Sequence, residues 1–280
     1  MNPLTRREQD DDPQKMLPWE GCYEVCEPKV AQWERRVSFC ERLLRGGYPD
    51  MMNASAMKRR LWFDSYVQTY VERDVRILRN IGDLRQFQAF LKAVALRNGQ
   101  LFNMSQVGRD LGLSVNTVKS WLSVLEASGL IYVLKPYHCN ESKRLVKTPK
   151  VYITDSGLLC YLLDLETAEQ VALSSMGGGV METAVLAEIR TALSFRGRRP
   201  ELYFWRTSNG TEVDIVVAQH SRLVPIEIKL SGTPKRKMAK GLEIFRADYP
   251  SNADPGWLVH TGEHTLPLGN DNTAIPFELL

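Results

Sequence analysis

The pattern of apolar and polar positions divides the chain into a helical first part and a strand-rich last part. In the first part apolar residues recur at helical spacing, and glycine or proline ends most runs. From about residue 200 apolar and polar positions alternate, which is typical of strands. We therefore predict helices over residues 29–45, 54–78, 83–97, 156–163, 180–195 and 235–245, and strands over 202–206, 212–218, 223–229 and 256–260. The run Gly177–Gly179 indicates either a flexible joint or the lead-in to a helix.

A helix-turn-helix is predicted between residues 105 and 128. Residues 105–112 form a short helix, Ser114 is placed as the N-cap of the next one, and that helix runs over 115–128. Residues 130–134 and 150–154 are expected to be strands that form a wing. In such a winged helix the first turns of the second helix enter the major groove of DNA.

Polar and basic side chains occupy the positions that would meet DNA. On the second helix those that can reach base edges or phosphates are Asn116, Thr117, Lys119 and Ser120. In the loop between the two strands those suited to phosphates are Lys143, Arg144, Lys147 and Lys150. Winged helices also dock proteins, so a protein partner stays open as the alternative.

The charge is distributed unevenly along the chain. The formal net charge is +3, but residues 58–150 carry 16 of the lysines and arginines against 7 acidic residues. The segments on both sides carry a small acidic excess. A basic middle part is typical of a nucleic-acid surface, although long solvated helices also display lysine and arginine.

Two of the predicted strands contain charged residues that are costly to bury unless they are paired or bind a metal. Asp214 lies in one strand, and Glu227 and Lys229 lie in the next, on one face of it by alternation. If the strands are neighbours, the three side chains converge. Carboxylate oxygens suit Mg²⁺, and a lysine beside them can stabilise charge on a phosphate, so this pattern predicts a metal-dependent nuclease site.

A carboxylate from the preceding helix would complete this site. Glu182 is the first candidate as third metal ligand and catalytic residue, and Glu188 is the second. The alternative is a salt-bridged hairpin in which Glu227 and Lys229 lie on a wet face without chemistry.

Composition narrows the protein class. With 44% apolar and 25% charged residues, the chain is typical of a globular protein. No apolar run reaches the length of a membrane span and the first residues lack the apolar core of a secretory signal, so we expect a cytoplasmic protein with no membrane partner. The five cysteines are scattered, and the pair Cys22 and Cys26 lacks a second pair that would complete a zinc site.

Several strings in the chain resemble one family. They are Gly46-Gly-Tyr-Pro49, Trp62-Phe-Asp-Ser-Tyr-Val67, Tyr70-Val-Glu-Arg-Asp-Val75, Arg97-Asn-Gly-Gln100, Thr117-Val-Lys-Ser-Trp-Leu122, Lys143-Arg-Leu-Val-Lys-Thr-Pro-Lys150, Tyr152-Ile-Thr-Asp-Ser-Gly-Leu158, Tyr203-Phe-Trp-Arg206, Glu212-Val-Asp214 and Pro225-Ile-Glu-Ile-Lys229. Together, from about Leu4 to Phe245, they resemble the C-terminal region of prokaryotic AAA-type ATPases that is catalogued as a domain of unknown function.

The resemblance implies a nucleotide-binding part followed by a helical lid, a winged helix and a restriction-endonuclease-like domain. The chain contains no Gly-x-x-x-x-Gly-Lys-Ser/Thr loop, so we expect no nucleotide site and no ATP hydrolysis by this chain itself. It looks like the family without its nucleotide-binding core, as a truncated gene or as a stand-alone relative, with that core on a separate subunit as one option. Arg73 and Arg76 could belong to a nucleotide-sensing lid in a complete protein.

These observations predict an α+β or α/β fold in three parts: a helical lid-like region over residues 1–82, a winged-helix domain over 83–165 and a restriction-endonuclease-like mixed sheet flanked by helices over 166–280. The expected function is a DNA-binding, nuclease-like portion of an AAA-type ATPase, with duplex DNA as partner and Mg²⁺ as the cofactor of a phosphodiester-cleaving site. The alternatives are a non-catalytic module that docks protein or DNA, and a DNA binder of the transcription-regulator type. A steep salt dependence of binding with sequence preference would favour the regulator.

Overall fold

The computed structural model describes residues 3–10, 12, 15–21, 39–70, 84–137, 146–197, 199–219 and 221–280. Contacts divide the chain into two compact units. Unit 1 comprises residues 1–4, 40–133 and 148–183, and unit 2 comprises residues 5–39, 134–147 and 184–280. The mixed helix and strand content confirms the predicted α+β class. The three-domain division stays a prediction.

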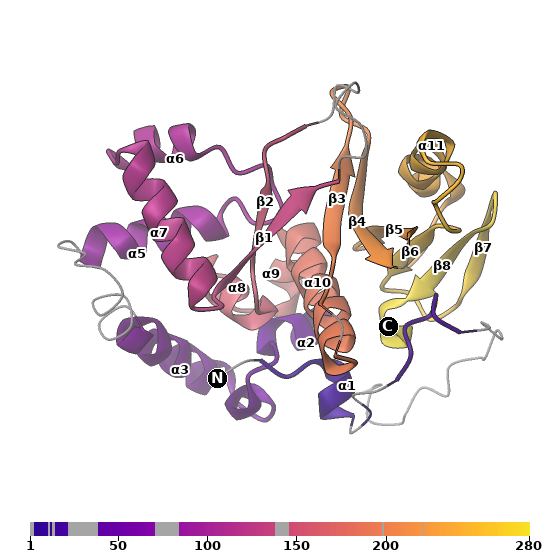
Figure 1. Cartoon of the computed structure of the whole chain (residues 1–280). Helices are drawn as coiled ribbons and strands as arrows, with labels where there is room; N and C mark the ends of the chain where they lie inside the picture. The colour runs from indigo at the N-terminus through magenta and orange to yellow at the C-terminus, as the bar shows by residue number, and fades with distance from the viewer. Residues whose placement is uncertain are drawn as a thin grey trace. The chain divides into compact units, whose positions relative to one another are not determined.

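Unit 1 consists mainly of helices (Figure 1). They are α2 (Phe39–Arg45), α3 (Ala56–Thr69), α5 (Leu84–Ala95), α6 (Met104–Leu111), α7 (Val115–Ala127), α8 (Ser156–Leu162) and α9 (Ala168–Leu173). The predicted helices over 29–45 and 54–78 are described only from Phe39 and only to Tyr70, so Arg73 and Arg76 lie outside the described residues. Helix α10 (Gly177–Phe195) begins in unit 1 and starts at the glycine run, so that run is part of the helix.

The two helices predicted over 105–112 and 115–128 are present as α6 and α7. Gly112 ends α6 with a φ of 65°, a conformation that glycine adopts without steric cost. Ser114 caps α7 by accepting the N–H of Thr117 at 3.0 Å. Trp121 packs edge-on against Phe87 and Phe90 of α5, so this tryptophan belongs to the core.

Two strands, β1 (Ile131–Pro136) and β2 (Lys150–Ile153), follow helices α5, α6 and α7 in the chain. Strand β2 is hydrogen-bonded to β1, whose residues up to Val133 belong to unit 1. Leu101, between α5 and α6, forms an isolated antiparallel bridge with Lys150. The element order of this part is therefore helix, bridge residue, helix, helix, strand, strand.

Unit 2 is built on a mixed sheet. Its strand order is β1-β3-β4-β5-β6-β8-β7, with bounds β3 (Leu202–Arg206), β4 (Glu212–Gln219), β5 (Arg222–Lys229), β6 (Trp257–His260), β7 (Leu266–Gly269) and β8 (Asn272–Pro276). The run β3, β4 and β5 is an antiparallel meander, and β6 is parallel to β5. The crossover between β5 and β6 contains the 3-10 helix η4 (Arg236–Ala239) and helix α11 (Lys240–Asp248).

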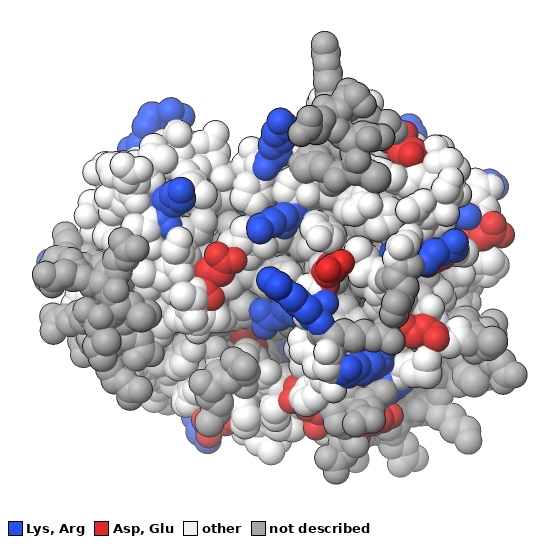
Figure 2. All heavy atoms as spheres, in the orientation of Figure 1, with Lys and Arg blue, Asp and Glu red and all other residues white. Residues whose placement is uncertain are grey.

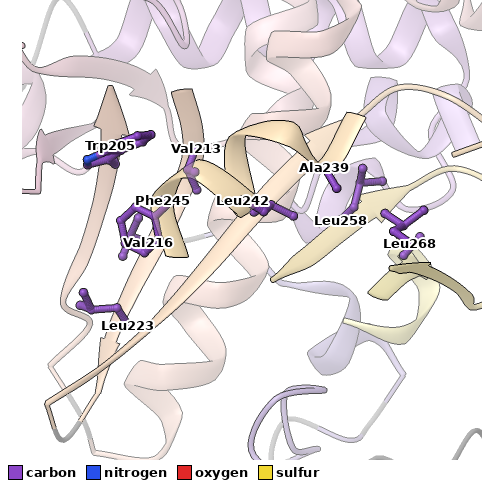
Figure 3. Close-up of a cluster of buried hydrophobic side chains, with 10 residues drawn as sticks. Trp205, Val213, Val216, Leu223, Ala239, Leu242, Phe245, Leu258 and Leu268 are labelled. Carbon is purple, nitrogen blue, oxygen red and sulfur yellow. The ribbon is translucent and has the colours of Figure 1, made fainter. Parts of the chain in front are cut away.

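Helix α11 covers one face of this sheet with an apolar cluster (Figure 3). Leu242 and Phe245 of α11 lie against side chains of the strands, and the rings of Phe245 and Trp205 meet edge-on at 5.4 Å between centroids. Burial of these large apolar side chains stabilises the sheet and fixes the position of α11 on it. The cluster is formed by Trp205, Val213, Val216, Leu223, Ala239, Leu242, Phe245, Leu258, Leu268 and Ala274.

The N-terminal arm is bound to the end of the chain within unit 2. Helix α1 (Arg6–Gln9) begins with a capping box between Thr5 and Glu8. The buried Arg6 forms a 3.0 Å ion pair with Glu278 and donates to the carbonyl of Leu280. Among the described helices, none combines the length and the apolar character that a membrane-spanning segment requires.

Candidate active site

A β-bulge on β4 positions Asp214. Tyr203 pairs with Val216 and Trp205 pairs with Val213, so Asp214 and Ile215 together lie opposite Phe204 alone. An extra residue of this kind interrupts strict alternation and turns the side chains around it, which is why bulges recur beside active sites. The sequence pattern predicted regular alternation in this strand and gave no sign of the bulge.

Strands β4 and β5 separate at the same point. The last Cα pair between them joins Ile215 to Ile226, so Asp214 is the first residue of β4 beyond the paired part. The Oδ2 atom of Asp214 accepts the N–H of Ile228 at 2.8 Å, so a side-chain oxygen satisfies a buried backbone donor there. This hydrogen bond is the one recorded for Asp214 among the described residues, and it leaves Oδ1 available to a ligand.

Glu227 and Lys229 lie on β5 beside this opening, so the predicted neighbourhood of the two strands is confirmed. Lys229 Nζ is 2.5 Å from Glu227 Oε1. The other oxygen of Glu227, Oε2, is buried and has no hydrogen-bond partner in the described part of the chain. Burial raises the pKa of the Glu227 carboxyl well above its usual range, the nearby Asp214 raises it further, and Lys229 lowers it.

The N-terminal end of α11 closes over this carboxylate. A Cβ on Gly241 would lie 2.2 Å from the carbonyl oxygen of Glu212 and 3.7 Å from Glu227 Oε2. Only glycine permits this close approach of the helix to β4. Glu212 itself forms a 2.5 Å ion pair with Arg206. Nothing in the sequence singles out Gly241, because an isolated glycine at the start of a basic helix gives no signal of this role.

The predicted third carboxylate has other partners. Glu182 belongs to unit 1, where its Oε2 accepts from the hydroxyl of Tyr152 at 2.8 Å and lies 3.9 Å from Lys150 Nζ. Glu188 belongs to unit 2, and its Oε1 accepts the N–H of Arg6 at 2.5 Å. Burial raises the pKa of Glu188. Glu188, which lies in the same unit as Asp214 and Glu227, thus bonds the backbone of the N-terminal arm.

Asp214 Oδ1 and Glu227 Oε2 are oxygens of the type that binds hard divalent cations. Both are carboxylate oxygens, and Glu227 Oε2 is a buried acceptor without a donor. No cluster of three or more His, Cys, Asp or Glu with metal-binding geometry occurs within the described ranges. A cation held here would therefore rely on two carboxylates and on waters, which is the usual situation of Mg²⁺.

The predicted DNA-contacting side chains differ in exposure. Asn116 and Lys119 on α7 are exposed, and Thr117 and Ser120 are partly exposed. Lys147 is also exposed, whereas Lys143 and Arg144 lie outside the described residues. The predicted phosphate contact of Lys150 does not fit its position. Its side chain is only 3% exposed, and its ammonium faces Glu182 and Tyr152. A group buried in this way is not placed to contact a phosphate.

Basic side chains do not merge into one patch on the face seen in Figure 2. Lysine and arginine are dispersed there among neutral and acidic side chains, on the part of the face that is described.

Two regions of the chain match protein families. Residues 36–169 match a family described as Domain of unknown function (DUF8612). Residues 177–280 match Domain of unknown function (DUF4143). The second of these is commonly a C-terminal region of AAA-type ATPases.

Two curated mycobacterial proteins are similar to the chain. They are Uncharacterized protein Rv2008c of Mycobacterium tuberculosis and Uncharacterized protein Mb2031c of Mycobacterium bovis, each 29% identical over 241 residues. The alignment covers 85% of this chain and 53% of each relative, so the chain spans about half the length of the curated relatives it matches. No solved structure matches the chain.

Proposed function

We propose that unit 2 is a metal-dependent nuclease domain that hydrolyses phosphodiester bonds of DNA at Asp214, Glu227 and Lys229. The observation that carries this proposal is the buried, unpartnered Oε2 of Glu227 beside Asp214. A buried carboxylate oxygen without a donor is unfavourable for folding alone. It becomes favourable when a cation binds, which is a reason for such a group to occur in a functional site.

The chemistry would be divided among the three side chains. Asp214 Oδ1 and Glu227 Oε2 would hold Mg²⁺, which when bound polarises the phosphate and lowers the pKa of a coordinated water. Lys229, whose side chain is 37% exposed, can place its ammonium next to the phosphate oxygens that gain charge. Hydrolysis consumes one water, whose oxygen joins phosphorus, and the sugar oxygen that leaves takes up a proton.

Unit 1 supports DNA binding through its helix-turn-helix. The order of α5, the bridge residue Leu101, α6, α7, β1 and β2 is that expected of a winged helix. The exposed Asn116 and Lys119 on α7 carry the contact. We infer that duplex DNA binds this unit through phosphates and that the first turn of α7 faces the major groove.

The match to the domain that commonly ends AAA-type ATPases supports a place in such an ATPase. We infer that this chain is the DNA-binding and nuclease-like portion of an ATPase of this type and that nucleotide binds to a part or subunit outside these 280 residues. ATP hydrolysis by the chain alone is not expected, because its sequence holds no phosphate-binding loop with a lysine.

A nuclease assay tests the proposal directly. Purified protein is incubated with plasmid, linear duplex and branched DNA in the presence of Mg²⁺, Mn²⁺ or EDTA. We expect cleavage that requires metal and that falls at least about 100-fold in Asp214→Asn and in Glu227→Gln. Glu201→Gln is the matched control, because Glu201 is an exposed carboxylate of the same unit.

The second candidate is a module that docks DNA or protein without chemistry. It is favoured by the ion pair between Lys229 and Glu227, which keeps one oxygen of the carboxylate occupied. DNA binding that is equal in the wild type and in Glu227→Gln, with no cleavage in any metal, would establish this second function and contradict the first.

A further inference from the structure

A run of basic residues extends over η4 to the first residue of α11 in unit 2 and has no role in the site described above. The exposed cations are Lys235, Arg236, Lys237 and Lys240. The sequence holds no acidic residue from Ser231 to Leu242, and none of the four cations forms an ion pair within the described chain. Unpaired cations at this density leave a positive potential that attracts a polyanion.

The fold holds this basic run firmly in place. On one side Thr261 donates its N–H to the carbonyl of Ser231 at 3.1 Å, which joins the loop before the run to the end of β6. On the other side Ala239 and Leu242 are fully buried in the apolar cluster beneath α11. The guanidinium of Arg236 lies over Gly269, where an added Cβ would be 3.1 Å from its Cζ. Such anchoring keeps the cost of ordering the lysines on binding low.

The run leads directly to the carboxylate pair. Lys240 is the first residue of α11, and the next residue, Gly241, is the one whose Cβ would lie 3.7 Å from Glu227 Oε2. A phosphate chain bound along the lysines would therefore reach the carboxylates at the start of the helix. The basic charge is also suited to offset the repulsion between DNA and the two carboxylates.

We propose that Lys235, Lys237 and Lys240 form a second DNA-binding surface, on unit 2, that holds the phosphate backbone of duplex DNA next to Asp214 and Glu227. The inference deepens the proposed function, on which it rests for the identity of the ligand. The inference goes beyond the proposed function because it assigns contacts with the DNA backbone to unit 2, in addition to those of the helix-turn-helix. Contacts to phosphates alone carry no sequence information, so this surface binds without sequence preference.

The test measures binding in EDTA, so it does not depend on cleavage. Fluorescence anisotropy of a labelled 30-base-pair duplex gives Kd at several salt concentrations, and the slope of log K against log salt counts the phosphate contacts. For the full chain with Lys235→Gln, Lys237→Gln and Lys240→Gln, we expect Kd at low salt to rise about tenfold or more. The slope should become shallower by roughly 0.9 for each lost contact.

A charge-matched control separates a local surface from general attraction. Lys58→Gln, Lys135→Gln and Arg199→Gln together remove the same charge from exposed positions elsewhere. The control is expected to keep the wild-type slope. Equal slopes in the lysine variant and the control would overturn the inference.

A third variant distinguishes failure of this inference from failure of the proposed function. Arg109→Gln with Lys119→Gln removes exposed cations of α6 and α7, both in unit 1. If that variant alone lowers the slope, DNA binds unit 1 only, and the inference falls while the proposed function stands. If the wild type itself does not bind the duplex, the inference and the proposed function are both overturned.

Discussion

Asp155 Oδ2 accepts the N–H of Gly47 at 2.7 Å, although 108 residues separate them in the chain. The Oδ1 atom of the same carboxylate caps α8 by accepting the N–H of Leu158 at 2.7 Å. One buried side chain thus ties the turn after α2 to the start of α8. The two strings Gly46-Gly-Tyr-Pro49 and Thr154-Asp-Ser-Gly157 therefore meet in space, and their shared role is structural.

Gly46→Ala should destabilise unit 1. Gly46 has a φ of 66°, and an added Cβ would lie 2.4 Å from Asp155 Oδ1, so the variant suffers both backbone strain and a clash. We expect the free energy of unfolding to fall by about 2–4 kcal/mol in urea denaturation. Gly178→Ala is the control, since nothing lies within 4 Å of its added Cβ and the helical site favours alanine. Equal effects of the two variants would contradict the proposed contact.

The stability of unit 1 should depend on pH through Asp155. Burial raises the pKa of this carboxyl from 3.8 to about 6, against the hydrogen bonds that lower it. Because its pKa is higher in the folded state, the protonated carboxyl adds to the free energy of unfolding. This contribution, about 3 kcal/mol, is fully present below pH 4 and is lost as the pH rises through 6. The difference in unfolding free energy between wild type and Asp155→Asn should therefore shrink between pH 4 and pH 7. The exposed Asp50→Asn serves as the control, and a difference that stays constant for Asp155→Asn would refute the assignment.

Glu227→Gln should stabilise the folded chain while it removes metal binding. Because burial and Asp214 raise the pKa of Glu227, its ionised form costs stability above that pKa, and the neutral amide avoids this cost. We expect a gain of about 1 kcal/mol at pH 8. Mn²⁺ should raise the melting temperature of the wild type and of Glu201→Gln but not of Glu227→Gln. A loss of stability with retained metal response would contradict the site.

Gly241→Ala should displace α11 from β4. The added Cβ would meet the Glu212 carbonyl oxygen at 2.2 Å, so the helix has to shift, at a cost of about 1–3 kcal/mol. Gly232→Ala, in the preceding loop, has no atom within 4 Å of its added Cβ and should change stability by less than about 0.5 kcal/mol. Calorimetric melting of both variants decides between these outcomes.

Lys150→Gln should affect stability and leave DNA binding unchanged. Its buried ammonium lies 3.9 Å from Glu182 Oε2 and 3.5 Å from the Tyr152 hydroxyl, so its loss should cost about 1–3 kcal/mol. The salt slope of duplex binding should match that of the wild type, whereas the exposed Lys147→Gln should make it shallower by about one. A shallower slope in Lys150→Gln would restore its predicted role at the phosphates.

Local patterns in the sequence predicted much of the fold. The turn at Gly112, the cap at Ser114 and the three strands of the meander follow from short-range chemistry that each segment carries by itself. The convergence of Asp214 with Glu227 also followed, because adjacent antiparallel strands bring their residues together.

Features that depend on distant contacts could not be predicted in this way. Lys150 looked like its neighbours in a basic loop, and only the packing of β2 shows that it is buried. The spacing of apolar residues in a helix indicates which face Glu182 lies on, but not that the hydroxyl of Tyr152 donates a hydrogen bond to it. Gly241 matters because of a carbonyl group on another element.

The bulge at Asp214 and Ile215 makes the site depend on the length of β4 as well as on its residues. Deleting one residue there would restore a regular register with β3. The side chains of the strand before the deletion would then point to the opposite face of the sheet. Asp214 or its replacement would then face away from Glu227, although every charged residue of the site could still be present in the chain. Insertions and deletions in this strand therefore deserve as much weight as substitutions when related sequences are judged for a working site.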